Sequence, residues 1–354
     1  MSPGGRALCA LALTLLVCVL PVVLLPGSRS ASETPSPAAA APGSPIPASP
    51  QLTPPSLGSA AGSSLQASPP TSLPPVSPFT GMPTDLGAPV LCVKIDNASS
   101  ARPQTGLADA DLVYVEPVEG GISRLLAVYQ SRFPPVVGPV RSIRLTDLQL
   151  LANFGRPALA YSGAATEVGA LVARAPVLDV SALARPGDYR RDRRRPMPYN
   201  LYGDTMALSQ GGAPPRDIGF RFGPTPPGGS PVPGVNSRYR ATDIGMQWVP
   251  AEARWVISMD GAPLTSASGP RPGAATVVLQ RVPVLDTPIR DSSGAPSPFA
   301  ATVGAGDAVV LRDGLAFTGN WSRPTPDAIT TFTLPGGSPL TFAPGPVWVV
   351  LVPV

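Results

Sequence analysis

The sequence predicts an α/β (or α+β) N-terminal domain with a mixed sheet over residues 79–235, followed by a small all-β C-terminal domain over residues 236–354. In the first region, strand-like segments alternate with segments whose apolar residues recur at helical spacing. In the second, short β-rich segments are separated by turn signals such as MDG, RDG and PGG, and no helical period lasts ten residues. We therefore expect the C-terminal region to form a barrel or a sandwich.

The N-terminal region supplies strands and helices in an irregular order. Strands are expected at PVLCVKID, at LVYVEPV after a short helical turn in GLADAD, and at GISRLLAVYQS. Gly120-Gly121 predicts a two-residue hairpin turn between the last two strands. Helices are expected over SIRLTDLQLLANF, with Ser142 as N-cap, over ATEVGALVARA, and from Asp204 onward. The segments PALAYSG and VLDVSAL add two further strands.

The C-terminal region reads as a series of strands. They are expected at MQWV, RWVISM, ATVVLQRV, DAVVLRDGLAFTGNWS, AITTFTL and VWVVLVPV. The last segment is too apolar for an edge strand, so we expect it in the middle of a sheet.

The first 78 residues predict a membrane-directed leader and a spacer. Residues 1–30 contain an uncharged apolar run over 7–26, which fits an uncleaved anchor, a cleaved signal peptide or a lipoprotein signal ending at Cys18. All three alternatives place the rest of the chain outside the cytoplasm, tethered to the membrane or secreted. Residues 31–78, rich in Pro, Ser and Ala, predict a disordered linker.

Composition excludes several classes of chemistry. The chain of 354 residues has no histidine, which excludes Ser-His-Asp and Cys-His mechanisms, and only three cysteines. Two of these lie in the apolar leader, so Cys92 is expected as a small buried hydrophobe, without a disulfide framework. We expect no cofactor and no zinc or copper site. The basic run RRDRRR at 190–195 is expected to be a solvated loop, and we expect no nucleic-acid partner.

A concentration of polar residues between Val93 and Arg144 marks the candidate site. Only 14% of the chain is charged, and buried charges need partners, so we expect these groups to meet. The candidate ligand-binding residues are Asp96, Asn97, Arg102, Gln104, Glu116, Glu119, Arg124, Arg141, Ser142, Arg144, Asn200 and Tyr202.

Local geometry suggests how these groups are arranged. With a two-residue turn, Glu119 pairs with Ile122 and reaches Arg124 diagonally, while Glu116 points to the other face opposite Leu125. The two glutamates are therefore not an obvious acid–base pair.

Two arginines and a second polar segment complete the site. Arg141 and Arg144 are expected to share a face at a helix N-terminus, either as an anion site or as partners of the nearby carboxylates. Asn200 and Tyr202, in PYNLYGDT, either line a groove or belong to a loop before the helix capped by Asp204.

These motifs resemble the YerB-like bacterial lipoproteins, whose domain is of unknown function. The resemblance rests on IDNASSARPQTGL, EGGISR and GPVRSIR, and it continues through WVISMDG and GDAVVLRDGLAFTGNWSR to the closing PGPVWVVLVP. It implies an envelope location, an α/β N-terminal domain and a β-rich C-terminal one. Where the family tends to have PHNLY, this chain has PYNLY, and a family histidine near ALAYSGA is also missing.

The sequence thus favours a membrane-tethered, extracytoplasmic protein that binds a cell-envelope ligand, such as a cell-wall polymer or an envelope protein. The alternative is an envelope hydrolase or transferase that uses Glu116, Glu119 or Asp96. A third interpretation makes the polar cluster an ion-pair network that only stabilises the fold.

Overall fold

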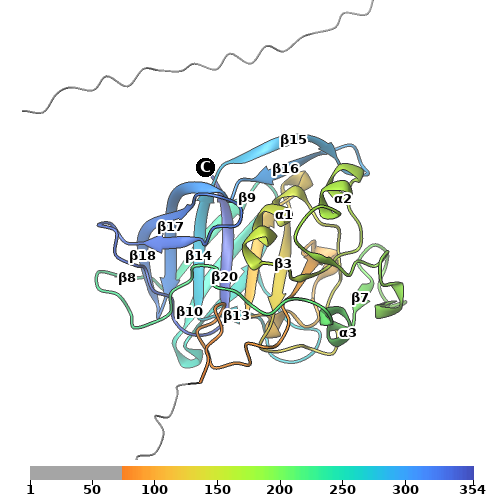
Figure 1. Cartoon of the computed structure of the whole chain (residues 1–354). Helices are drawn as coiled ribbons and strands as arrows, with labels where there is room; N and C mark the ends of the chain where they lie inside the picture. Colours follow the sequence, from red (N-terminus) through yellow and green to blue (C-terminus); the bar gives the residue numbers. More distant parts are fainter. Residues whose placement is uncertain (1–73) are drawn as a thin grey trace, which may run out of the picture. The chain divides into compact units, whose positions relative to one another are not determined.

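One large mixed sheet carries the fold of residues 74–354, the part of the chain that the computed structural model describes (Figure 1). The sheet has 11 strands within these residues. Its spatial order is β19 (Thr331–Thr333), β18 (Leu315–Arg323), β17 (Gly304–Arg312), β14 (Thr276–Val282), β20 (Val347–Pro353), β2 (Leu112–Pro117), β3 (Ser123–Tyr129), β1 (Leu91–Asp96), β4 (Ala158–Ala160) and β5 (Leu178–Asp179), with β8 (Ser230–Pro231) beside β18.

Strands from both halves of the chain build this sheet. The C-terminal strand β20 runs parallel to β14 on one side and to β2 on the other, so it joins the two regions. The all-β character of the C-terminal region and the central place of VWVVLVP are confirmed. Most of its strands, however, extend the N-terminal sheet and do not close on themselves.

A smaller sheet covers one face of the large one. It contains β12 (Ala262–Pro263), β11 (Arg254–Met259), β10 (Thr242–Val249) and β9 (Gly234–Tyr239), with β13 (Gly273–Ala274) beside β11. Its Ile244, Trp255 and Ile257 pack in one buried cluster with Val93 and Val115 of the large sheet. The two sheets therefore form a sandwich, whose smaller layer comes from the C-terminal region alone.

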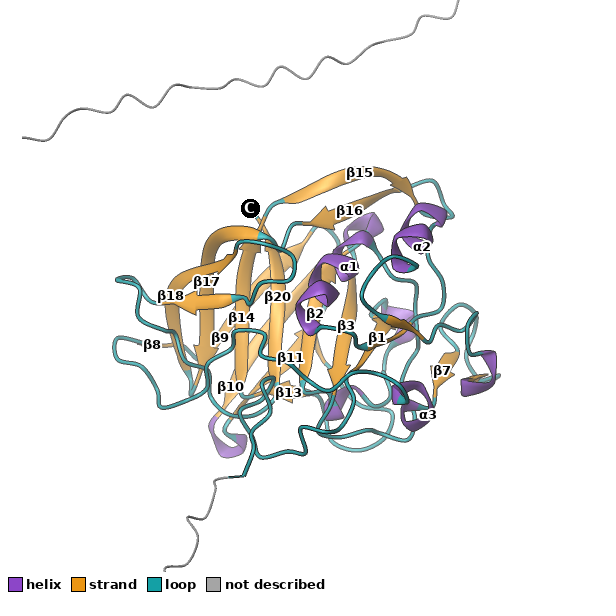
Figure 2. Cartoon of the chain, in the orientation of Figure 1, coloured by secondary structure: helices purple, strands orange, loops and turns teal. Residues whose placement is uncertain are grey.

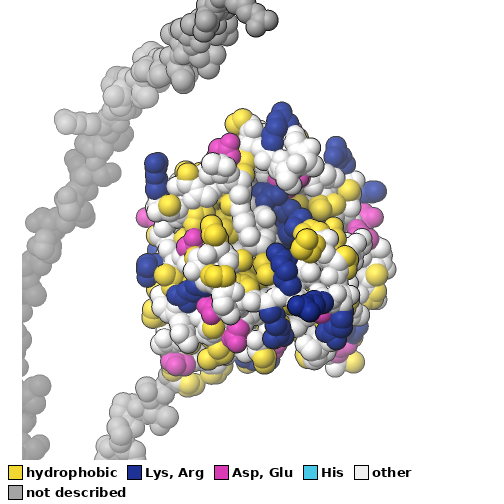
Figure 3. All heavy atoms as spheres, turned by 90° about the vertical axis from the view of Figure 1, so that its right-hand side faces the viewer, with side chains coloured by type: hydrophobic (Ala, Val, Ile, Leu, Met, Phe, Trp, Pro, Cys, Tyr) yellow, Lys and Arg dark blue, Asp and Glu magenta, His cyan; other side chains and the backbone are white. Residues whose placement is uncertain are grey.

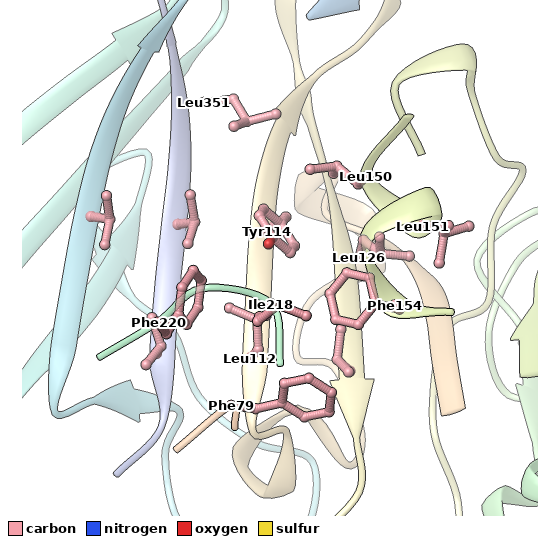
Figure 4. Close-up of a cluster of buried hydrophobic side chains, with 14 of the residues drawn as sticks. Phe79, Leu112, Tyr114, Leu126, Leu150, Leu151, Phe154, Ile218, Phe220 and Leu351 are labelled. Atoms are coloured by element: carbon pink, nitrogen blue, oxygen red, sulfur yellow. The ribbon is translucent and has the colours of Figure 1, made fainter. Parts of the chain in front are cut away.

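Helices cover the other face (Figure 2). They are α1 (Leu145–Leu151) and α2 (Thr166–Val172). The third helix, α3 (Thr205–Ser209), packs against β1 and β4 on the same face as the smaller sheet, where Leu208 joins its buried cluster. Phe154 follows α1 and packs with Leu126, Leu150 and Tyr114 in the second buried cluster, shown in Figure 4. Cys92 lies in this cluster, fully buried and free, as expected, and burial raises the pKa of its thiol.

Two smaller β-structures flank the core. One is the hairpin of β15 (Val284–Arg290) and β16 (Pro296–Ala300), which extends over α1 in Figure 1. The other pairs β6 (Tyr189–Arg191) with β7 (Leu201–Gly203), on the side of the molecule that carries α3.

The predicted hairpin turn at Gly120-Gly121 is wrong. Pro117 pairs with Ser123, so the connection is longer than two residues and contains the 3₁₀ turn Glu119–Gly121. A Cβ on Gly121 would lie 2.6 Å from the Cβ of Arg240, and the amide of Ala241 donates to the Gly121 carbonyl. This close approach of a distant segment accompanies the longer connection.

The predicted start of the first helix is also wrong. α1 begins at Leu145, so Arg144 is its N-cap, and Arg141 and Ser142 lie in the extended segment before it. The Asp147 carboxylate accepts a hydrogen bond from the Arg144 amide at 2.6 Å. A side chain of the helix itself thus satisfies its first free amide. The predicted cap of α3 is confirmed, since Asp204 accepts from the amide of Ala207.

The predicted leader 1–30 lies outside the described residues, as does the linker up to residue 73. Val76 already pairs with Pro83, and Ser77 is buried, so the folded chain includes the last residues before Phe79. Among residues 74–354, no helix combines the length and apolar composition that crossing a membrane requires.

Candidate functional site: an arginine-lined pocket

The ends of β1, β2 and β3 bring charged side chains to one face of the sheet. Arg124 of β3 lies directly opposite Asp96 of β1 and Glu116 of β2, so all three side chains share a face. The predicted placement of Glu116 opposite Leu125 is therefore wrong. These groups form three clusters. In two of them the polar groups are paired with one another inside the protein, and the third lines a cavity.

The first cluster is a closed ion triad. Lys94 Nζ lies 2.7 Å from Asp147 Oδ1 and 2.8 Å from Glu116 Oε2, and all three side chains are fully buried. Burial raises the pKa of Glu116 to about 8, and the nearby charge of Asp147 adds to this rise. The triad ties the sheet to α1 and has no access to a ligand in this conformation.

The second cluster, also closed, is built around the loop after β1. Gln104 donates to the side-chain oxygen of Asn97 at 2.9 Å, and Asn97 donates to Ser123 Oγ at 2.8 Å. Arg102 donates to the Asn97 carbonyl and pairs with Asp260 at 2.8 Å. The three candidates Asn97, Arg102 and Gln104 thus connect the large sheet to the smaller one.

The third cluster lines a cavity of about 410 Å³, here called the arginine pocket. Five predicted site residues meet in it, together with residues of α2 and of the β15–β16 hairpin. Its polar lining consists of Glu119, Arg124, Arg141, Ser142, Arg144, Thr166, Glu167, Arg290, Asp291, Ser292 and Ser297. A volume of this size falls within the range of small-molecule sites.

Glu119 and Arg144 form the back of the arginine pocket. Nε and Nη2 of Arg144 donate to the two carboxylate oxygens of Glu119 at 2.5 and 2.8 Å, and Ser297 Oγ donates to the same carboxylate at 2.5 Å. Burial raises the pKa of Glu119, but the hydrogen bonds from Arg144 and Ser297 outweigh it and hold the pKa below its usual value. Glu119 therefore stays ionised as a structural partner.

Arg124 is the least satisfied buried charge in the arginine pocket. Its side chain is 7% exposed, and its closest carboxylate oxygen, on Glu119, is 3.8 Å away. One nitrogen donates to the Ser142 carbonyl, but the buried Nε has no hydrogen-bond partner within residues 74–354. Burial, followed by the positive charge of Arg144, lowers the pKa of Arg124 to about 10.

Arg141 forms the side of the arginine pocket nearest β1. Its Nε lies 2.9 Å from Asp96 Oδ2, and its side chain remains 26% exposed while that of Asp96 is 3% exposed. Asp96 also accepts from the amide of Ala98. Asp96 is thus a buried partner of Arg141, while part of the Arg141 side chain remains accessible.

The remaining candidates lie elsewhere. Tyr202 lines a separate cavity and accepts a hydrogen bond from Arg195, and Asn200 accepts one from Arg191. Sequence reasoning missed Glu167, Arg290, Asp291 and Ser297 in the arginine pocket. The polar turn RDSSG at 290–294 was the available signal, but nothing local indicates that it reaches the ends of β2 and β3.

Comparisons with known proteins agree with this architecture. A solved structure, the YerB protein from Bacillus subtilis, superposes with a TM-score of 0.66 at 21% identity, over 78% of this chain and 96% of that one. At that identity the likeness concerns the fold alone. The curated "Putative lipoprotein YerB" of Bacillus subtilis (strain 168) is 44% identical over 82 residues, which are 22% of this chain and 24% of that protein. The alignment with this curated relative thus spans about a quarter of its length.

Two family descriptions cover most of the folded chain. Residues 79–218 match "Protein of unknown function (DUF3048) N-terminal domain", and residues 235–349 match the corresponding C-terminal domain. The chain belongs to the DUF3048 family, as its YerB-like motifs predicted.

Proposed function

We propose that this protein is an extracytoplasmic, membrane-tethered binding protein that holds an anionic group of a cell-envelope ligand in the arginine pocket. The main support for this proposal is that the guanidinium of Arg124 is buried and its Nε has no hydrogen-bond partner within residues 74–354. A buried unpaired donor costs about 1–3 kcal/mol. A carboxylate or phosphate in the pocket would supply the missing acceptor and offset the repulsion among Arg124, Arg141 and Arg144.

The envelope location rests on two supports. The apolar run over residues 7–26 is flanked by Arg6 and Arg29, as in a leader or anchor. The curated relative from Bacillus subtilis carries the name of a lipoprotein. Together they favour a folded part held outside the cytoplasm, facing wall polymers and envelope proteins.

Binding is favoured over hydrolysis or transfer by the state of the carboxylates. Glu116 is fully buried in the ion triad, and Asp96 stands behind Arg141. Glu119 is accessible from the arginine pocket, but its lowered pKa makes it a weak general base. The carboxylates Asp96 and Glu119 are already paired with arginines, and Arg124 retains a free donor. This arrangement suits recognition of an anion.

The test is a binding isotherm on the full chain with two probes, glycerol phosphate and a muramyl peptide carboxylate. Arg141→Ala should weaken binding by about 1.5–3 kcal/mol, the range for a hydrogen bond to a charged group. Arg290→Ala should also weaken binding, because Arg290 lines the same pocket from an exposed hairpin. Arg238→Ala is the matched control, since the Arg238 side chain is 74% exposed and pairs only with Asp243.

A thermal melt of each variant separates binding from folding. Arg141→Ala leaves Asp96 with the Ala98 amide as a partner, so a moderate loss of stability is expected. Arg290→Ala should melt with the wild type. Equal affinities of wild type, Arg141→Ala and Arg290→Ala for both probes would contradict the proposal.

A further inference from the structure

A second basic cavity lies on the same side of the molecule. This loop pocket, of about 690 Å³, is formed mainly by β6, β7 and the turn between them. Its charged lining consists of five arginines, between residues 190 and 195, and two aspartates, Asp109 and Asp192. Thr105, Tyr202, the Pro134–Val136 segment and the Ala267–Gly269 segment complete its walls. The run RRDRRR therefore borders a cavity, where only a solvated loop was expected.

The arginines of the loop pocket differ in their partners. Arg195 is fixed, because it donates to Tyr202 Oη and to the carbonyls of Ser100, Arg102 and Pro103. Arg194 pairs with Asp192. Arg190 and Arg193 are exposed, and neither side chain makes a hydrogen bond or ion pair with another residue of the described chain. Their positive charges are thus available to a ligand.

One short segment joins the two pockets. Asp96, at its start, contacts Arg141 of the arginine pocket, and Ser100 accepts a hydrogen bond from Arg195 of the loop pocket. An extended chain spans at most about 3.6 Å per residue, so the two guanidinium groups lie roughly 25 Å apart or less. A flexible chain of a few charged repeats can span that distance.

Both pockets carry an excess of positive charge. The loop pocket has five arginines against two aspartates, and the arginine pocket has four arginines against three carboxylates. Together the two pockets hold nine arginines against five carboxylates. Figure 3 shows the side of the molecule that carries α2 and β7, with Lys and Arg side chains running across its middle.

We infer that the ligand is a linear polyanion that occupies the arginine pocket with one charged group and the loop pocket with another. This inference rests on the proposed function and names its ligand class: a flexible polymer with phosphate or carboxylate groups at regular intervals. A nucleic acid fits poorly, because base binding needs exposed aromatic rings. Tyr202, which lines the loop pocket, is 6% exposed and is held by Arg195.

Two linked contacts produce a measurable signature. When one repeat is held in the arginine pocket, the next repeats reach the loop pocket at a high effective concentration. Affinity per repeat should therefore rise with chain length until the polymer spans both pockets. Loss of the loop pocket should remove this gain and leave the binding of a single repeat unchanged.

The experiment compares glycerol phosphate with a poly(glycerol phosphate) of defined length, at fixed salt, on the full chain. Wild type should bind the polymer at least about tenfold more tightly per repeat than the monomer. Arg190→Ala/Arg193→Ala should lose this gain and keep monomer affinity, and Arg141→Ala should weaken both ligands. Arg238→Ala is again the control. The same titration is made with a polyuronate. If its affinity per repeat rises with chain length in the same way, the inference is supported and carboxylate is assigned as the repeated group.

Two results would overturn the inference while leaving the proposed function intact. One is a chain-length gain that survives in Arg190→Ala/Arg193→Ala. The other is a single-stranded oligonucleotide of equal charge that binds as tightly as both polymers. Failure of the proposed function has a different signature, in which neither monomer nor polymer binding depends on Arg141.

Discussion

Lys94, Glu116 and Asp147 place one positive and two potentially negative groups where water does not reach. An uncompensated buried charge is costly, so one carboxyl holds a proton. Burial, aided by the charge of Asp147, raises the pKa of Glu116 from 4.5 to about 8, so Glu116 is mainly protonated at neutral pH. In that state the triad is electrically neutral.

The raised pKa of Glu116 predicts a stability that falls with increasing pH. Below pH 4.5 the group is protonated in both states, and its contribution is fully present. Between pH 4.5 and about 8 only the unfolded chain releases the proton, so the free energy of unfolding falls by up to about 1.4 kcal/mol per pH unit, and above about 8 the slope vanishes. Glu116→Gln imitates the protonated form and should remove this slope, as measured by urea unfolding from pH 5 to pH 8.

The matched control for this measurement is Glu167→Gln, which removes one carboxylate from an exposed position. It should keep the wild-type slope. A Glu116→Gln variant that loses stability with pH as steeply as the wild type would show that another group dominates.

At the residue scale, the sequence predicted which charges matter better than how they pair. The excess of polar groups between Val93 and Arg144 correctly indicated Glu119, Arg124, Arg141 and Arg144 as neighbours. Their pairing depends on the register of β2 and β3. Gly121 packs against Arg240 at that connection, and no local pattern reports a contact so distant in sequence.

At the element scale, the β15–β16 hairpin shows why part of the site escaped sequence reasoning. Pro288, Pro296 and Pro298 cannot donate ladder hydrogen bonds and argue against strands. The hairpin nevertheless forms, and β16 is anchored where Ser297 donates to Glu119 and the Ala300 amide donates to Thr146. Contacts with β2 and α1, supplied by the rest of the fold, outweigh its weak local preference.

The hairpin tip is expected to serve binding more than stability. Replacing residues 291–295 with Asn-Gly removes Ser292 from the wall of the arginine pocket and the Gly294 carbonyl that holds Arg290, and we expect these losses to outweigh the removal of the Asp291 carboxylate. Affinity for glycerol phosphate should fall at least about tenfold, or 1.4 kcal/mol. The free energy of unfolding should change by less than about 1 kcal/mol, because the tip is exposed and the anchors of β16 remain.

A parallel replacement in the turn Pro335–Ser338 tests whether shortening alone causes the effect. A Cβ added at Gly336 or Gly337 would meet no atom within 4 Å, so this turn lies in open space. Its replacement should leave affinity unchanged. If the hairpin variant binds glycerol phosphate as tightly as the wild type does, the hairpin does not contribute to the binding site.

At the scale of the whole molecule, strand β20 lies in the middle of the main sheet and joins its two regions. The apolar run VWVVLVP correctly predicted a central strand, because such a strand is buried on both faces. The sequence could not indicate that its neighbours are β2 and β14, since Leu112 and Thr276 both pair with Val347 and contacts so distant in sequence leave no local signal. The N-terminal and C-terminal regions thus share one sheet.

This arrangement predicts that the two halves fold as one cooperative unit. A fragment of residues 74–235 retains β1, β2 and β3 but lacks β20, so Leu112–Val115 would form an open, fully apolar edge. It also lacks the smaller sheet, which covers Val93 and Val115. We expect the amides of β1 and β3 to be protected from hydrogen exchange in a chain of residues 74–354 and to exchange freely in the fragment, with no cooperative thermal transition. A fragment of residues 74–235 that melts cooperatively with those amides protected would show that the N-terminal half folds independently of β20.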